Sequence, residues 1–128
     1  MITTSSINTM LDSLISGPVQ VALSTTKPLL SSTDPSGVIA VTEPTGGSYA
    51  RVTLPVTGWE AAADRMKRTS TDITFPAPTG DWGSVGWVVI YSGTEVIFFG
   101  ALDRLVDVTA GGDQLNIPAN TLSIYMAE

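Results

Sequence analysis

Apolar residues recur with two different periods along the chain, and the change of period falls at Pro18. In residues 1–17 they follow the spacing of one helix face, at Ile7, Met10, Leu11, Leu14 and Ile15. We therefore expect a short amphipathic helix, capped by Ser5 or Ser6 and closed at Gly17. A helix of about twelve residues is marginal in water on its own. Its apolar stripe should dock either on its own domain or on a partner subunit.

After Pro18 the apolar period becomes 2, which is typical of half-buried strands. Candidate strands separated by turn residues lie at 19–24, 37–41, 49–56, 71–75, 85–91, 95–102, 113–117 and 121–126. Runs 85–91 and 95–102 are apolar on both faces and predict a β-hairpin at the centre of the core. Runs 113–117 and 121–126 predict a second hairpin. This pattern predicts an all-β fold, a β-sandwich of about seven or eight short antiparallel strands with one short N-terminal helix.

The length of 128 residues fits a single domain that can bury its own core. We expect the helix in 1–17 and the sandwich in 18–128. A long surface loop rich in Ser, Thr, Pro and Gly should occupy about 28–47. The stretch "GGSYARV" ends this loop, and we interpret Gly46 and Gly47 as a turn that precedes a strand rather than as an anion cradle.

The residue types present exclude several kinds of chemistry. The chain has no Cys and no His, which removes disulfides, thiolate nucleophiles, histidine acid–base catalysis and nearly all transition-metal sites. Twelve acidic against six basic residues give a net charge of −6, which opposes binding to nucleic acid or anionic membranes. Only 14% of the residues are charged and 43% are hydrophobic, which favours oligomeric or assembly contacts. We expect no cofactor, no nucleic acid and no membrane partner.

No enzyme motif is matched. Ser84 lies in "DWGSVGW", which does not fit G-x-S-x-G, and no His could act as its base. Asp103 and Asp107 are four residues apart, which on a strand separates them by about 13 Å, too far to chelate one ion. We therefore expect no catalytic residue, no metal site and no enzymatic activity. The N-terminal segment lacks Lys and Arg, so it does not read as a secretory signal.

Several side chains are candidates for contact with another protein. Arg65, Lys67 and Arg68 form the main basic cluster of an acidic chain and should meet an acidic protein surface. Trp87 should be buried within a core strand, whereas Trp59 and Trp82 border turns and should be freer to meet a partner. The full set of predicted contact residues is Ile7, Met10, Leu11, Leu14, Leu29, Leu30, Arg51, Trp59, Arg65, Lys67, Arg68 and Trp82. Arg51 is included as a candidate inter-subunit salt-bridge partner.

The order of short motifs along the chain carries further information. It runs "NTMLDSL", "VQVALST", "GGSYARV", "ITFPAPTGDWGSVGW", "IYSGTEVIFFGAL" and "VTAGGDQLNIPANTLSIYM". This order resembles that of small structural proteins of tailed phages, labelled phage tail fibre proteins or capsid decoration (cement) proteins. The basic stretch at 59–68 and the long loop depart from that pattern, so they are natural places for contacts specific to this member.

The resemblance implies a non-enzymatic virion protein made in the host cytoplasm. The preferred interpretation is a capsid decoration protein that binds the major capsid protein on the outer head surface, as a homo-oligomer, trimer or dimer. A tail or tail-fibre component is the alternative within the virion. A carbohydrate-binding module is a third possibility from another class, in which Trp59, Trp82 and Tyr49 would stack on sugars.

Overall fold

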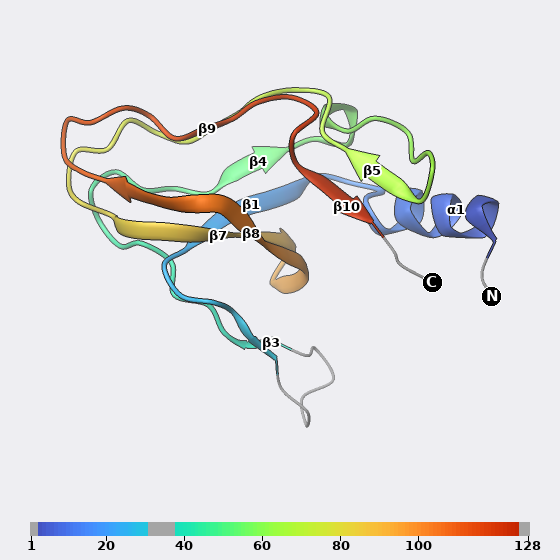
Figure 1. Cartoon of the computed structure of the whole chain (residues 1–128), viewed down its shortest axis with the longest axis horizontal. Coiled ribbons are helices and arrows are strands. Elements are labelled where there is room, and N and C mark those ends of the chain that lie inside the picture. The colour runs from blue at the N-terminus through green and yellow to red at the C-terminus, as the bar shows by residue number, and fades with distance from the viewer. Residues whose placement is uncertain (1–2, 31–37, 126–128) are drawn as a thin grey trace. The chain divides into compact units, whose positions relative to one another are not determined.

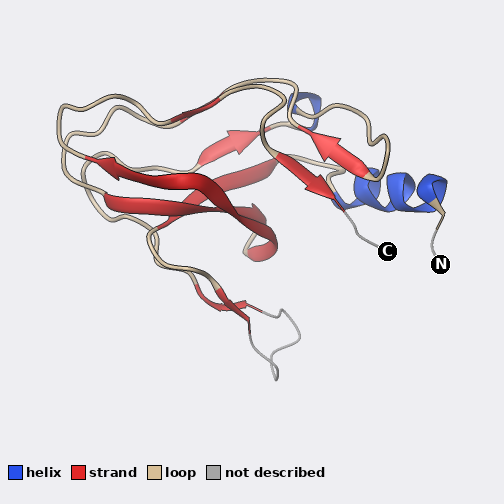
Figure 2. Ribbon diagram, in the orientation of Figure 1, coloured by secondary structure: helices blue, strands red, loops and turns tan. Residues whose placement is uncertain are grey.

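The structure is a computed structural model that describes residues 3–30 and 38–125 (Figure 1). The predicted class is confirmed, because the fold is mostly β with one short N-terminal helix (Figure 2). Its elements are α1 (Thr4–Leu14), β1 (Val19–Ser24), β2 (Leu29–Leu30), β3 (Val38–Ala40), β4 (Val52–Leu54), the 3₁₀ helix η1 (Val56–Gly58), β5 (Met66–Arg68), β6 (Ile73–Thr74), β7 (Gly83–Ser92), β8 (Glu95–Val108), β9 (Asn116–Ile117) and β10 (Ser123–Tyr125).

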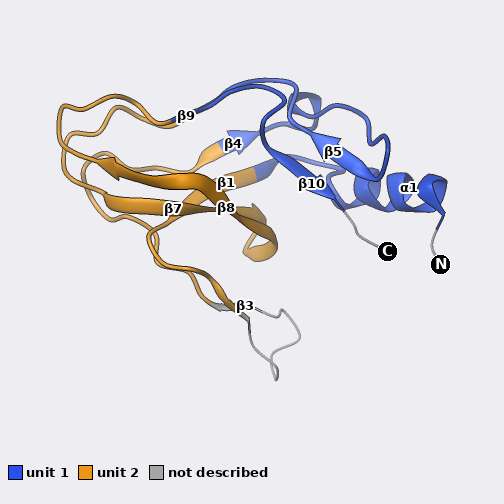
Figure 3. Cartoon of the chain, in the orientation of Figure 1, with its two compact units in different colours: residues 1–19, 53–73, 116–128 blue, residues 20–52, 74–115 orange. Residues whose placement is uncertain are grey.

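The chain divides into two compact units, and each draws on segments that are distant in the sequence (Figure 3). Unit 1 comprises residues 1–19, 53–73 and 116–128, and unit 2 comprises residues 20–52 and 74–115. The helix and the β5–β10 ribbon belong to unit 1. The long β7–β8 hairpin belongs to unit 2. The expectation of one domain stays a prediction.

The predicted central hairpin is present in unit 2 and is longer than expected. Strands β7 and β8 pair antiparallel around a turn at Gly93, whose φ of +64° is a conformation that glycine adopts without strain. Strand β1 pairs with the other edge of β7, with Leu23 opposite Val88. The sheet order is β4-β1-β7-β8, so β8 is an edge strand.

The core of unit 2 lies over β1 and β7. Ala22, Val89 and Tyr91 form a buried cluster, and Val96 and Phe99 pack against it from β8. The sequence predicted that both strands of the hairpin would be buried on both faces. This holds for most of β7, but residues 96–100 of β8 are only half-buried because an edge strand has one neighbour instead of two.

Strand β8 is irregular where it passes Gly86. Val85 pairs with Val106 and Trp87 pairs with Ala101, so residues 102–105 lie opposite Gly86 alone. A Cβ at Gly86 would come within 2.5 Å of Leu105 Cδ2. The missing side chain therefore gives Leu105 room to lie over β7, in a bulge of the edge strand.

The predicted surface loop at 28–47 contains a small ladder, because β2 pairs with β3. This β2–β3 arm extends away from the four-stranded sheet of unit 2 in Figure 1. Its base is fastened by Thr42, whose O accepts from Thr25 N at 2.9 Å and whose N donates to Ser24 Oγ at 3.2 Å. Thr26 Oγ1 also donates to Thr42 Oγ1 at 2.9 Å.

In unit 1, α1 lies against β5 and buries Ile7 and Leu11 of its apolar stripe. Its N-cap is Thr3, whose hydroxyl accepts from Ser6 N at 3.1 Å, and not Ser5 or Ser6 as expected. The helix stops at Leu14 because Ile15 already leaves helical geometry, with φ −109° and ψ 67°. The predicted closure at Gly17 is therefore wrong, and Gly17 is not among the residues with positive φ.

The predicted C-terminal hairpin is also wrong. Strand β10 pairs with β5, with Tyr125 opposite Met66, and β9 pairs with β6. Between β9 and β10 the chain makes a local turn in which Thr121 N donates to Pro118 O at 3.3 Å and Asn120 has φ +67°. This turn redirects the chain toward an earlier strand instead of reversing it onto β9.

Candidate functional site

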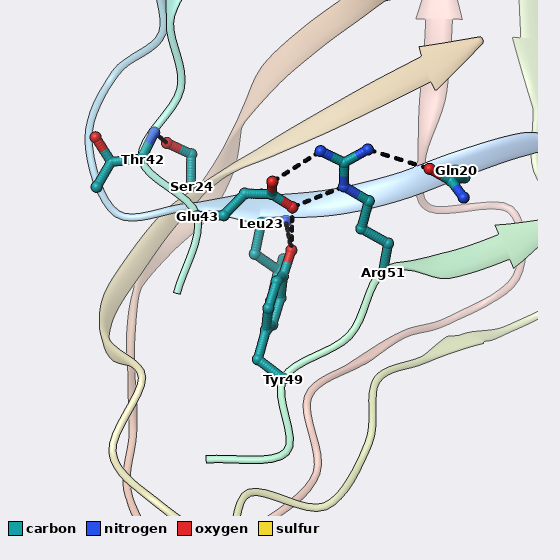
Figure 4. A network of polar contacts seen from close by, with 7 residues as sticks. All are labelled: Gln20, Leu23, Ser24, Thr42, Glu43, Tyr49 and Arg51. Carbon is teal, nitrogen blue, oxygen red and sulfur yellow. Dashed lines mark hydrogen bonds and ion pairs between the residues drawn. The ribbon is translucent and has the colours of Figure 1, made fainter. Parts of the chain in front are cut away.

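The main polar network of unit 2 centres on Arg51 and Glu43 (Figure 4). Arg51 donates from Nε to Glu43 Oε1 at 2.9 Å and from Nη2 to Glu43 Oε2 at 2.8 Å. Its Nη1 donates to Gln20 Oε1 at 3.1 Å. The guanidinium carbon lies 3.9 Å from the centre of the Tyr91 ring, a cation–π contact. Each of the three guanidinium nitrogens thus donates to a side chain of the same chain, and one face of the group lies over Tyr91.

Tyr49 connects this ion pair to strand β1. Its hydroxyl donates to Glu43 Oε1 at 2.9 Å and accepts from Leu23 N at 3.0 Å (Figure 4). Its ring packs edge-to-face on Trp82, with 5.2 Å between ring centres. Trp82 Nε1 in turn donates to Gly47 O at 2.9 Å. The two aromatic residues therefore fix the "GGSYARV" stretch on the sheet.

The electrostatics of the network match a structural clamp. The hydrogen bonds from Arg51 hold the pKa of Glu43 below its ordinary value, and Glu43 raises the pKa of Arg51. Burial, with help from the Glu43 carboxylate, raises the pKa of Tyr49 well above that of a free phenol. The carboxylate accepts from both the phenol and the guanidinium, which also bond to Leu23 N and Gln20.

The turn before Tyr49 has the role that the sequence suggested. Gly46, Gly47 and Ser48 all have positive φ, at +72°, +58° and +64°, and Tyr49 N donates to Gly46 O at 3.0 Å. A Cβ at Gly47 would lie 2.9 Å from Gly80 O. Glycine is needed there for its backbone conformation and also for the close approach of a second backbone segment.

The basic segment does not present its three charges together. Lys67 is 4% exposed, and its ammonium donates to Asp12 Oδ1 at 2.7 Å and to Glu60 O at 3.1 Å. Arg65 also contacts the helix, since its backbone N donates to Asn8 Oδ1 at 3.0 Å and its side-chain Nε donates to Thr4 Oγ1 at 3.1 Å. Arg68 is exposed. Two of the three predicted contact cations are therefore engaged with α1 of the same unit.

The helix face divides in a similar way. Ile7 and Leu11 are each 1% exposed, whereas Met10 and Leu14 are 42% and 44% exposed. Ile7 and Leu11 are therefore buried within their own chain and not against a neighbouring subunit. Met10 and Leu14 are the helix residues that a partner could reach.

The remaining predicted contact residues differ in exposure. Leu29 is 54% exposed, and the side chain of Leu30 lies outside the described residues. Trp59 and Trp82 are only 6% and 4% exposed, while Trp87 is half-buried, which reverses the expectation for the tryptophans. Trp82 is covered because it packs on Tyr49. Neither ring offers a face for stacking on a sugar.

Several residues that make these contacts were not predicted from the sequence. Glu43 lies in an irregular loop and Asp12 lies on the polar face of the helix, and neither position carries a pattern that indicates its partner. The burial of Lys67 could have been predicted from the sequence. Side chains alternate along a strand, so Lys67 points to the face opposite that of Met66 and Arg68.

Two further properties of the described residues concern metal binding and membrane crossing. In residues 3–30 and 38–125, no three His, Cys, Asp or Glu side chains are grouped so that they could hold a metal ion. Within the same ranges, no helix has the length and apolar character needed to cross a bilayer.

The described chain is an antiparallel β fold with one short helix, and its Glu43–Arg51 network is satisfied within the chain. Residues 1–125 match the family described as podophage GP4 fiber I protein gp80, and the chain belongs to that family. It is therefore a structural component of a phage virion. No curated protein matches the chain. The word "fiber" in the family description favours the tail-fibre alternative over capsid decoration.

Proposed function

We propose that this protein is a non-enzymatic component of a phage tail fibre. The observation that carries the proposal is the match of residues 1–125 to a fibre protein family. The match spans nearly all of the 128 residues, so it concerns the whole fold and not one shared motif. Capsid decoration, the preferred interpretation of the sequence alone, has no comparable support.

The contacts within the chain are consistent with a building element. Glu43, Tyr49 and Arg51 are hydrogen-bonded to one another and serve to fasten a loop on the sheet. The low charge content and the exposed apolar residues suit protein–protein contacts that are repeated by symmetry. Many modest contacts can then give tight attachment without a deep pocket. The partners proposed are other virion proteins, including further copies of this chain.

Labelling of intact particles tests the location. Antibodies raised against the purified chain and coupled to gold should mark the tail region in negative-stain images, with no label on the head. Particles from a phage with the gene disrupted serve as the control and should carry no label. Uniform labelling of the head surface would contradict the fibre proposal and restore capsid decoration. Absence of the chain from purified particles would contradict both.

A further inference from the structure

The outer face of the β5–β10 ribbon is uncovered in unit 1. Along β5, Lys67 is turned toward α1 and buried, so Met66 and Arg68 lie on the opposite face. Tyr125 is the direct cross-strand partner of Met66. Met66 is 37% exposed and Tyr125 is 64% exposed. We call Met66, Arg68 and Tyr125 the ribbon face.

The composition of the ribbon face is that of an interface. Tyr, Met and Arg are the residue types enriched where proteins meet, and an exposed Tyr beside Met provides apolar area around a fixed charge. The backbone of Glu60 lies beside that of Arg68, since Glu60 N donates to Arg68 O at 2.8 Å. No ion pair joins the Glu60 and Arg68 side chains in the described part of the chain. A partner for this face needs a carboxylate next to an apolar side chain.

The irregular end of β8 in unit 2 has that composition. Asp103, Arg104, Leu105 and Asp107 are exposed, and Leu105 is the most exposed large apolar residue of the described chain, at 66%. Leu105 reaches this position because the bulge opposite Gly86 lets it lie over β7. Asp107 accepts a hydrogen bond from Ser84, which fixes its orientation. We call Asp103, Leu105 and Asp107 the β8 row.

We infer that the ribbon face of one copy binds the β8 row of a second copy. The net charge of −6 makes copies repel one another in most orientations. An orientation that sets Arg68 between Asp103 and Asp107 replaces repulsion with attraction. The same orientation covers Leu105 with Met66 and Tyr125. The two carboxylates outnumber the one exposed cation of this stretch, Arg104, so the two surfaces are complementary in both net charge and apolar content.

This contact joins two different surfaces of the chain. Where it repeats head to tail it is heterologous, and it closes into a ring when the rotation permits. The inference rests on the proposed function only for the expectation that copies assemble.

Charge reversal tests the contact in solution with the full-length chain. Arg68→Glu places a carboxylate against Asp103 and Asp107, and Asp103→Arg places a cation against Arg68. Each variant alone should lose self-association, with an apparent dissociation constant raised at least about tenfold, measured by sedimentation velocity at low salt. Lys27→Glu and Asp113→Arg are matched controls, since they make the same charge changes at exposed positions outside both surfaces. The controls should associate like the wild type.

Mixing the two variants gives the decisive result. In a mixture, the carboxylate introduced by Arg68→Glu in one copy faces the cation introduced by Asp103→Arg in its neighbour. The next contact, between the unchanged surfaces of the two variants, has the wild-type pair. Assembly should therefore return, whereas a contact between two identical faces would not be rescued. A wild-type chain that stays monomeric at high concentration, equal losses in the controls, or no rescue on mixing would each overturn the inference.

The result is independent of where the protein lies on the particle. Gold labelling of the tail together with a monomeric chain in solution would overturn the contact and leave the fibre proposal intact. Rescue on mixing together with labelling of the head would support the contact and reject the fibre. Circular dichroism of each variant confirms that the fold is retained, so a loss of association cannot be mistaken for unfolding.

Discussion

At the residue scale, the Glu43–Arg51 pair is the most informative target. Glu43→Gln removes the negative charge but keeps the shape, so Arg51 stays stacked on Tyr91 without its counter-charge. We expect a loss of about 1–3 kcal/mol in the free energy of unfolding, because the hydrogen bonds lost are charge-assisted and partly buried. Urea denaturation measures this change in the free energy of unfolding. Glu95→Gln, at an exposed position beside the hairpin turn, should change stability by less than about 0.5 kcal/mol.

The pH dependence of the same pair has a definite sign. The pKa of Glu43 is lower in the folded chain than in the unfolded chain, where it is about 4.3. Its contribution to stability is therefore complete above that ordinary value and is lost as the pH falls through the folded-state pKa. The stability difference between wild type and Glu43→Gln should be largest near neutral pH and should shrink in acid. A difference that does not change with pH would contradict the role assigned to the carboxylate.

Gly46 and Gly47 of the "GGSYARV" turn allow the cost of a left-handed backbone conformation to be measured separately from the cost of overpacking. Gly46 and Gly47 both have positive φ, but a Cβ at Gly46 would meet nothing within 4 Å, whereas one at Gly47 would clash with the Gly80 backbone. Gly46→Ala should cost about 1–2 kcal/mol for its backbone conformation alone. Gly47→Ala should cost about 1–3 kcal/mol more because of overpacking. Equal losses in thermal or urea unfolding would show that the contact with Gly80 has no effect on stability.

At the element scale, one ion pair fastens the helix to the ribbon. Asp12→Asn would leave the buried Lys67 ammonium without its counter-charge and with neutral acceptors such as Glu60 O, at a cost of about 1.5–3 kcal/mol. Hydrogen exchange should show that Asp12→Asn speeds the opening of α1 more than it speeds the opening of β7. Adding Lys67→Met should recover much of the loss, because no buried charge is then left unpaired. Faster exchange in the double variant than in Asp12→Asn would contradict this account.

The elements also show what could be predicted from the sequence. The β7–β8 hairpin was predicted because its two runs and its turn are adjacent in the chain. The partners of β9 and β10 were missed because β6 and β5 lie about 40 to 60 residues earlier and no local signal records that pairing. The ion pair of Asp12 with Lys67 was missed for the same reason. Glu43 and Arg51 are only 8 residues apart, and their pair was missed because Glu43 lies in an irregular loop that carries no pattern. Trp82 was misjudged because its position near a turn suggested exposure, while Tyr49 covers it.

At the scale of the whole molecule, the helix separates folding from assembly. Ile7→Ser with Leu11→Ser removes buried side chains, and we expect loss of more than about 4 kcal/mol and poor recovery of folded protein. Met10→Ser with Leu14→Ser changes the exposed side of the same helix and should leave the melting temperature nearly unchanged. Because exposed apolar side chains are the ones that a neighbour in the virion can cover, the second pair should reduce incorporation of the chain into particles, measured by quantitative immunoblot of purified phage. Incorporation at the wild-type level would assign the helix a role in folding alone.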